Sequence, residues 1–423
     1  MSSQESLRKK IRIIGAGFSG LTCAYYLVKA GFEVEIYEKS ERVGGLLQSF
    51  KTPYGMLEYA ANGLLNSEAL ETMASDIGLS LNFTLEEARV RYIYRNGIKR
   101  FPIRAVEFFA LSIFLFKMIF MRKSILPKNS ESIRSWGSRM LSPSLSLYTL
   151  ETALQGIYAG DPVKMSASLI LKNFFGGPRT KVKRGSVAPQ AGMSELVEKL
   201  QQYLLKNGVQ VFYKQELQFK ELQVPTVFAI PAYEAAKCLE VLDPHLAQTL
   251  ARIEYLPVIS AQVFFSESSE SLKAFGCLFP PENSNLVLGV LFNHCIFAGR
   301  VKNAKSEKWI LGGGAVQNRK EFLALSDHEI LNLVLERRRL LIKEFKDKPL
   351  SELIKAVLDV KISRIERAFP NYSVELESTL RGLKSENKNV LLHGNYLGEL
   401  GLTKLLERSA RIAKQIKLLN GAS

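Results

Sequence analysis

Three glycines near the amino terminus stand at the spacing of a nucleotide-phosphate loop. Gly15, Gly17 and Gly20 form a G-x-G-x-x-G pattern directly after an apolar run, residues 11–14, which is typical of a buried strand. Apolar residues then recur at helical intervals over 21–28, so a helix is expected to begin within the glycines. The glycines permit a tight turn and close approach of the backbone to a pyrophosphate. The helix N-terminus offers unpaired N–H groups to that anion, so the pattern predicts a dinucleotide site.

A second strand is predicted over 33–37, and an acid, Glu38, follows it. The acid lies about 20 residues past the glycines, where this fold needs an acceptor for ribose hydroxyls. Glu38 also begins a stretch containing Arg42, Gly44 and Gly45, which resembles the E-x-x-x-R-x-G-G motif of flavin amine oxidase-like proteins. In those proteins the arginine and the glycine pair hold the FAD pyrophosphate against the first loop. The resemblance implies FAD as the cofactor.

The length and charge of the chain restrict its class. A chain of 423 residues suggests two or three domains. The net charge of +16 suits an anionic membrane surface, an acidic substrate or nucleic acid, and the absence of a nucleic-acid motif argues against the last. Four cysteines without a C-x-x-C pair and four histidines without ligand spacing predict no metal site and a reducing compartment. The first ten residues lack an apolar signal segment, so we expect a cytoplasmic protein.

The stretch 102–123 is unusually apolar. Residues 108–116 carry no charge and are rich in aromatics, but Glu107 and Lys117 interrupt a run that would need about 20 apolar residues to span a bilayer. We expect a helix that lies in a membrane interface, with Arg122 and Lys123 at the headgroups. A buried or partner-facing helix is the alternative.

The remaining pattern predicts an α/β protein with α+β character and three domains. The Asn96–Gly97 pair predicts a hairpin, and 327–362 is expected to be helical. The predicted domains are a discontinuous Rossmann-like FAD-binding domain (1–65, 185–255 and 380–423), a mixed-sheet substrate-binding domain (66–101 and 256–379) and a helical, membrane-associated domain (102–184).

Three further stretches are similar to motifs of one family. Residues 156–166 read G-I-Y-A-G-D-P-V-K-M-S, residues 275–300 contain F-G-C-L-F-P, L-G-V-L-F and I-F-A-G-R, and residues 393–402 read H-G-N-Y-L-G-E-L-G-L. In this order they resemble the protoporphyrinogen oxidase family over nearly the whole chain. The resemblance implies an oxidase that aromatises protoporphyrinogen IX or coproporphyrinogen III in haem biosynthesis. Hydride would pass to flavin N5, and dioxygen or another acceptor would reoxidise the flavin, giving hydrogen peroxide with dioxygen.

The resemblance also implies site residues. Because the flavin supplies the chemistry, no catalytic side chain is expected. The implied cofactor-binding residues are Gly15, Ala16, Gly17, Phe18, Ser19, Gly20, Glu38, Lys39, Arg42, Gly44, Gly45, Leu46, Leu217, Gly394, Asn395, Leu400, Gly401 and Leu402. The implied substrate-binding residues are Asn62, Phe275, Gly276, Leu278 and Phe297, with Arg95 or Arg300 as candidates to meet a propionate.

Two departures from the family pattern keep other functions open. Residues 58–63 read E-Y-A-A-N-G where the family has E-x-G-P-N/R-S, and 293–295 read N-H-C in place of serines. One alternative is an amine oxidase or carotenoid-desaturase-like enzyme, although no motif locates the lysine that many amine oxidases carry near flavin N5. Another is a non-catalytic FAD-binding partner protein. The main interpretation is a cytoplasmic enzyme attached peripherally to a membrane, and a homodimer is left open.

Overall fold

The computed structural model describes residues 10–100, 107–120, 125–176, 182–283 and 286–419. One layer is a parallel sheet whose five strands follow the order β10-β2-β1-β11-β17. Its strands are β1 (Lys10–Ile14), β2 (Glu33–Tyr37), β10 (Gln210–Phe212), β11 (Thr226–Phe228) and β17 (Val390–Leu392). All four pairings between these strands are parallel. The sheet is therefore built from the beginning, the middle and the end of the chain.

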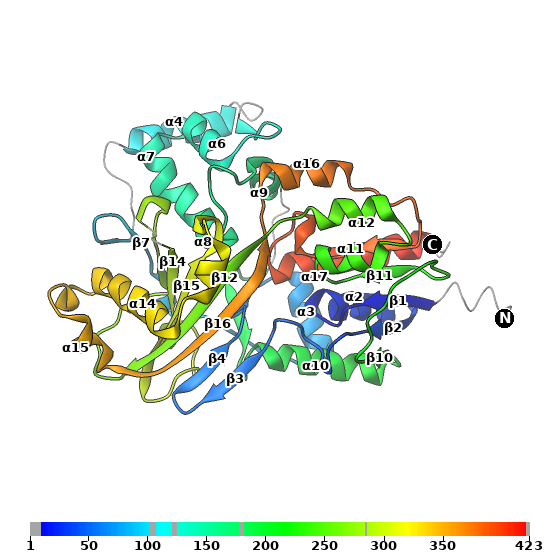
Figure 1. Ribbon diagram of the computed structural model, residues 1–423, viewed down its shortest axis with the longest axis horizontal. Coiled ribbons are helices and arrows are strands. Elements are labelled where there is room, and N and C mark those ends of the chain that lie inside the picture. The colour runs from blue at the N-terminus through cyan, green and yellow to red at the C-terminus, as the bar shows by residue number, and fades with distance from the viewer. Residues whose placement is uncertain (1–9, 101–106, 121–124, 177–181, 284–285, 420–423) are drawn as a thin grey trace.

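Helices cover both faces of this sheet (Figure 1). One core cluster joins Ile11 and Ile13 to α2, α3, α10 and α17, and a second joins Ile14 and Phe228 to α11 and α12. The helices are α2 (Phe18–Lys29), α3 (Glu68–Asp76), α10 (Met193–Lys206), α11 (Ala232–Leu239), α12 (Pro244–Ala251) and α17 (Leu402–Leu419). Strands that are buried on both faces read as near-continuous apolar runs, and residues 11–14 follow this pattern except at the half-buried Arg12.

A second, mixed sheet has seven strands in the order β16-β12-β15-β14-β13-β7-β8. They are β7 (Arg91–Tyr94), β8 (Ile98–Lys99), β12 (Tyr255–Ser266), β13 (Gly276–Leu278), β14 (Val287–Phe292), β15 (Ala304–Gly312) and β16 (Val357–Pro370). One face packs under the helices α13 (Arg319–Ala324), α14 (Asp327–Leu341) and α15 (Leu350–Ile354). The hairpin predicted at Asn96–Gly97 is confirmed, with φ of 50° and 109° at the two residues.

The helical expectation for 327–362 is wrong at its end. Helix α14 ends at Leu341, but Val357 begins the 14-residue strand β16, which pairs antiparallel with β12. This strand lies at the edge of the sheet, so it carries many charged side chains among its β-branched residues. Such charges are also typical of the exposed face of a helix, and here the pairing with the buried β12 decides the conformation.

Short sheets and helices complete the fold. Strands β3 (Ser49–Thr52) and β4 (Gly55–Glu58) form one ribbon, and β5 (Leu64–Leu65), β9 (Ser186–Pro189) and β6 (Leu81–Phe83) form another sheet. The helical segment contains α4 (Glu107–Phe120), α6 (Ile133–Met140), α7 (Pro143–Leu145), the π-helix η2 (Ser146–Glu151), α8 (Thr152–Tyr158) and α9 (Ala167–Gly176). Helix α16 (Val374–Gly382) lies between β16 and β17 in the chain. Across the described residues, none of the helices combines the length and the apolar character that a bilayer crossing requires.

Candidate cofactor and substrate site

The glycine loop joins β1 to α2 with very close packing. Gly15 has φ of +97°, and a Cβ there would lie 2.8 Å from the Ala229 carbonyl oxygen. A Cβ on Gly20 would lie 1.9 Å from the Gly15 carbonyl oxygen, so the helix approaches the loop as only glycine allows. Gly17 differs, because no atom lies within 4 Å of its ideal Cβ position. Gly15 and Gly20 therefore shape the turn, and Gly17 borders open space.

The second glycine pair lies directly against this loop. The Gly44 N–H donates to the Ala16 carbonyl over 2.8 Å, and Gly17 and Gly44 form a parallel bridge. A Cβ on Gly45 would lie 3.3 Å from the Gly17 Cα. The Arg42 guanidinium donates to the carbonyls of Val43 (3.0 Å) and Gly45 (2.7 Å), so it shapes its own loop. Leu46, which follows, is exposed.

Glu38 is fixed at the carboxyl end of β2. Its carboxylate accepts hydrogen bonds from the Ala16 N–H at 2.7 Å and from the Ser40 N–H at 2.9 Å. The acid is thereby held beside the glycine loop. Lys39 points elsewhere, because its ammonium pairs with Glu234 of α11 at 3.0 Å. Leu217 packs against the second core cluster.

The carboxyl end of β17 reaches the same edge of the parallel sheet. The His393 N–H donates to the Phe228 carbonyl over 2.9 Å, and Gly394 and Asn395 follow. The Asn395 carbonyl accepts a hydrogen bond from the Tyr372 hydroxyl. Gly401, with φ of +99° and open space at its Cβ position, precedes α17, which begins at Leu402. In such sheets ligands bind beyond the carboxyl ends of the strands.

These residues fit a dinucleotide. Helix α2 has no side-chain cap on its first turn and no acidic residue there, which leaves its N-terminal N–H groups for an anion. The side chain of Phe18 is buried in the core and Ser19 is half-buried, so these residues can reach a ligand only through the first turn itself. The open space at Gly17 suits a pyrophosphate, and Glu38 suits a ribose.

Four of the five predicted substrate residues fall into two groups on or beside the second sheet, and Asn62 lies between β4 and β5. Gly276 and Leu278 of β13 share one face, and Leu278 is so close to α8 that a Cβ on Gly156 would lie 2.5 Å from its Cδ2. Phe275 and Phe297 belong instead to a small apolar cluster with Ile296. The Phe297 ring reaches the 60–63 segment, at 3.1 Å from the Cβ position of Gly63.

The structure does not favour Arg95 or Arg300 as the cation that meets a propionate. Arg300 is buried and donates to Glu58 at 2.5 Å and to the Pro189 carbonyl at 2.9 Å. Burial raises the pKa of the Glu58 carboxyl, although its hydrogen bond from Ser49 and the charge of Arg300 oppose this. Arg95 is buried too, and it pairs with Glu107 at 2.8 Å. Both guanidinium groups are held in internal ion pairs, whereas a propionate needs an accessible cation.

Lys308, on β15, is a buried cation that the sequence reasoning missed. Its ammonium donates to the carbonyls of Glu58 and Ala60, both at 2.7 Å, and to Asn62 Oδ1 at 3.2 Å. The Asn62 amide in turn donates to Asn293 Oδ1 at 2.8 Å. The available signal was a lysine directly before the apolar run 309–311 in a strand-rich region.

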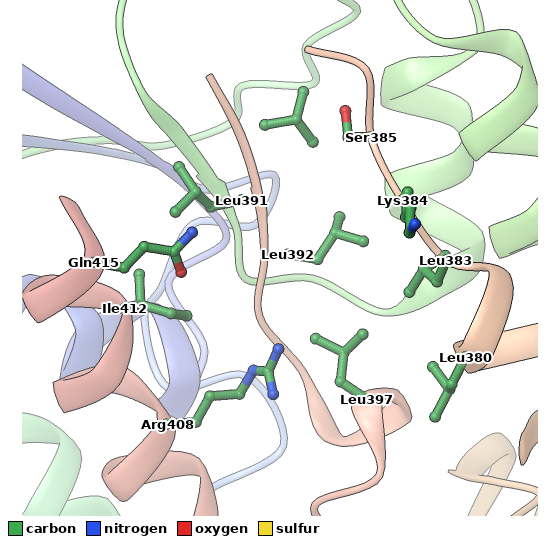
Figure 2. A pocket seen from close by; sticks show the side chains of 11 residues that line it. Leu380, Leu383, Lys384, Ser385, Leu391, Leu392, Leu397, Arg408, Ile412 and Gln415 are labelled. Carbon is green, nitrogen blue, oxygen red and sulfur yellow. The ribbon is translucent and has the colours of Figure 1, made fainter. Parts of the chain in front are cut away.

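A cavity of about 360 Å³ lies outside this site (Figure 2). It is enclosed by α16, β17 and α17, and Leu392, Leu397 and Arg408 are among the side chains that line it. None of the predicted cofactor or substrate residues lines it. Within the described part of the chain, no cluster of three or more His, Cys, Asp or Glu residues could hold a metal ion.

Comparisons with known proteins agree with this geometry. Residues 13–77 match the family of NAD(P)-binding Rossmann-like domains. The chloroplastic protoporphyrinogen oxidase of Nicotiana tabacum is 23% identical over 96% of this chain and 84% of its own length. A coproporphyrinogen III oxidase of Staphylococcus aureus is 34% identical, but over 23% of this chain and 21% of its own.

Solved structures show the same fold. A protein from Exiguobacterium sp. 255-15 that is assigned as a protoporphyrinogen oxidase superposes with a TM-score of 0.75 at 17% identity, covering 99% of this chain and 100% of that one. Putrescine oxidase superposes with a TM-score of 0.69 at 13% identity, covering 97% and 99%. The mixed α/β fold with a Rossmann-like domain is therefore confirmed. The comparisons also support FAD as the cofactor and oxidoreductase as the enzyme class. Along most of its length, the chain is thus similar to protoporphyrinogen oxidases, as its sequence motifs predicted, and it has the fold of flavin amine oxidase-like proteins.

Proposed function

We propose that this protein is an FAD-dependent oxidase that aromatises a porphyrinogen, either protoporphyrinogen IX or coproporphyrinogen III. The observation that carries the proposal is that a predicted FAD site and an apolar surface lie next to each other. A dinucleotide cradle assembled from three separate segments stands beside a sheet whose apolar residues suit a large, flat ligand. The similarity to a named protoporphyrinogen oxidase over 96% of the chain supports the same substrate class.

Each part of the proposed site has a physical role. The cofactor, once bound, would supply hydride acceptance at N5 from a bridging carbon, with dioxygen as the final acceptor giving hydrogen peroxide. The first turn of α2 would bind the pyrophosphate through N–H groups, and Glu38 would accept hydrogen bonds from the ribose. Residues 400–402 would line the ring system at the start of α17. Phe275, Leu278 and Phe297 would hold the macrocycle and exclude water.

The test begins with the purified protein and its visible spectrum. We expect a bound flavin, bleaching when either porphyrinogen is added without oxygen, and porphyrin fluorescence when oxygen returns. Glu38→Gln should weaken FAD binding, because only one polar atom of the amide accepts hydrogen bonds, whereas both oxygens of the charged carboxylate do. Protein that is colourless and cannot be reconstituted with FAD would refute the proposal. Bound FAD without turnover of either porphyrinogen would favour the non-catalytic partner protein.

A second candidate is an amine oxidase. It is favoured by the buried Lys308, since many amine oxidases carry a lysine near flavin N5, and by the likeness in fold to putrescine oxidase. The same anaerobic mixing with a diamine such as putrescine separates the two candidates. Bleaching by the amine, with no bleaching by porphyrinogens, would replace the first proposal with the second.

We also propose that α4 lies on the surface of an anionic membrane, on the cytoplasmic side. Helix α4 is anchored by the pairing of Glu107 with Arg95 and by Phe114, whose ring meets Trp136. Most of its other apolar side chains are exposed, and the exposed fraction reaches 74% at Phe109. Apolar side chains on a chain of net charge +16 suit an anionic headgroup region. The predicted headgroup residues Arg122 and Lys123 lie outside the described residues.

Sedimentation with lipid vesicles tests this surface. Vesicles containing phosphatidylglycerol should carry the protein down at low salt, and pure phosphatidylcholine should do so less. The double variant Phe109→Ser with Ile119→Ser should bind at least tenfold more weakly, because two exposed apolar side chains are lost (about 1.5–3 kcal/mol each on full burial). Leu205→Ser, on α10, is the control, since that leucine is 50% exposed but lies outside α4. Equal loss in both variants would contradict the proposal.

A further inference from the structure

Lys308 lies on the face of the second sheet that is not covered by α14. Its cross-strand neighbours are Leu291 on β14 and Gln262 on β12. The alternate residues Trp309 and Leu311 belong to the core under α14. Lys308 therefore shares its face with Leu291, which packs against the cluster of Phe297.

The segment that Lys308 holds is residues 58–63, which runs from the last residue of β4 to the start of β5. This segment has no regular hydrogen-bonded ladder of its own over 60–63. Lys308 is only 2% exposed, and its three hydrogen bonds go to two carbonyls and to the Asn62 side chain of this one segment. Gln262 adds a bond to the Met56 carbonyl at 2.9 Å. Side chains of the second sheet thus hold this segment and the strand before it.

The other side of the segment contacts the proposed cofactor elements. Ala61 packs against the core of the parallel sheet. Just beyond, the Leu65 carbonyl accepts a 2.6 Å hydrogen bond from Thr403 Oγ1, in the first turn of α17. The predicted flavin-lining residues 400–402 directly precede this threonine. The segment therefore bridges the substrate sheet and the start of α17.

We propose that Lys308 is a positioning residue, which fixes the 58–63 segment and so sets Asn62 and the wall of the cofactor site between the two sheets. The inference rests on the proposed function for the role of Asn62 toward a substrate, but not for the effect on the cofactor. A charged donor suits this task because hydrogen bonds from an ionised group are stronger than neutral ones, and three acceptors match the three N–H groups of an ammonium.

The surrounding charges give this clamp a pH dependence. Burial lowers the pKa of Lys308 to about 8 against an ordinary 10.5, and the Glu58 carboxylate opposes the shift. Glu58 also pairs with Arg300 at 2.5 Å. On the loop before β15, the His294 ring lies 3.0 Å from the Ser306 carbonyl, and burial lowers the pKa of this histidine. Above about pH 8 the neutral amine keeps two donors for three acceptors.

This loss of a donor is distinguishable from unfolding. The pKa of Lys308 is lower in the folded chain than in the unfolded chain, so between about pH 8 and 10.5 the unfolded chain binds more protons. The contribution of Lys308 to stability therefore rises with pH across that window. Deprotonation of Lys308 should therefore loosen segment 58–63 without lowering the free energy of unfolding.

The experiment compares Lys308→Met, which keeps the aliphatic stem, with Lys308→Arg, which keeps the charge. The matched control is Lys305→Met, because Lys305 is on the same strand but donates to the Ser269 carbonyl at 2.6 Å, away from the segment. Each variant is measured for the FAD dissociation constant, for amide hydrogen exchange of 58–63 at pH 7 and pH 9, and for melting temperature.

We expect Lys308→Met to exchange the 58–63 amides about tenfold faster and to bind FAD about tenfold more weakly, the effect of losing one charge-assisted hydrogen bond net. In wild type, exchange of this segment should rise from pH 7 to pH 9 by more than the intrinsic increase, and in Lys308→Arg it should not. Lys308→Arg should recover part of the FAD affinity, and Lys305→Met should match wild type. Wild-type exchange and FAD affinity in Lys308→Met would overturn the proposal.

Two further readouts keep the outcome decisive. If Lys308→Met does not fold, Asn62→Ala removes one acceptor of the clamp, and faster exchange at 58–61 in that variant would support the proposal, whereas unchanged exchange would overturn it. With a turned-over porphyrinogen, Lys308→Met should raise KM more than it lowers kcat. FAD affinity and exchange are measured without substrate, so a failure of the proposed function leaves them interpretable.

Discussion

Gly17 and Gly20, the last two glycines of the first loop, should respond differently to substitution by alanine. Gly17→Ala should weaken FAD binding, whereas Gly20→Ala should lower stability. Gly17 has φ of −69° and ψ of 179°, which alanine adopts readily, and no atom lies within 4 Å of the added methyl group. Gly20→Ala puts that methyl 1.9 Å from the Gly15 carbonyl oxygen, and real Cβ atoms essentially never come within 3.0 Å of another heavy atom. Gly17→Ala therefore fills the space proposed for the ligand, whereas Gly20→Ala pushes the backbones of α2 and the loop apart.

The magnitudes follow from these contacts. In Gly20→Ala the helix or the loop must move by at least 1.1 Å, the difference between 1.9 and 3.0 Å, and neither neighbour is a flexible side chain. We expect the free energy of unfolding of the apoprotein to fall by about 3 kcal/mol, the upper end for overpacking. In Gly17→Ala the unfolding free energy should change by less than about 1 kcal/mol, because the gain in chain stiffness and the loss of a glycine cap are similar in size. A methyl group between the loop and the pyrophosphate should raise the FAD dissociation constant about 5- to 150-fold.

Urea unfolding of the apoprotein and titration with FAD, followed by flavin fluorescence, measure the two effects separately. Gly382→Ala is the control, since its Cβ position is also open but it lies at the end of α16, away from the loop. Wild-type FAD affinity in Gly17→Ala would refute the position assigned to the pyrophosphate. Wild-type stability in Gly20→Ala would refute the close packing of α2 on the loop.

Three other predictions test the buried charges and the packing of the two sheets. Arg338→Met should lower the unfolding free energy in urea by about 3–5 kcal/mol, because Glu307, 3.0 Å away, would remain buried without its partner. His393 is buried with a pKa lowered from 6.5 to about 3, so below pH 6.5 the unfolded chain binds the extra proton and stability falls. The loss should be about 2 kcal/mol at pH 5 relative to pH 7, and His393→Gln should lack it in urea unfolding at both pH values. Gly156→Ala should displace Leu278 and raise KM for the turned-over porphyrinogen several-fold with little change in kcat, and an unchanged KM would separate Leu278 from the substrate wall.

Local chemistry explains which parts of the fold could be predicted. The strand, glycine loop, helix and second strand over residues 11–38 are specified by neighbours in sequence, and so is the turn at Asn96–Gly97, which needs two positive φ angles. The strand β16 was missed because its alternating charges resemble the exposed side of a helix. Only pairing with β12, about 100 residues earlier, separates the two readings.

The site divides in the same way. The amino-acid sequence by itself determined the glycine loops and Glu38, because backbone freedom and a terminal acid are properties of single positions and short spacings. Only the tertiary structure decided the partners of the buried charges: Arg300 is held by Glu58 across 242 positions of sequence, and Lys308 reaches the 58–62 segment across 246 to 250. A buried charge is stable only where the fold brings it a partner, and no local pattern specifies which distant partner that will be.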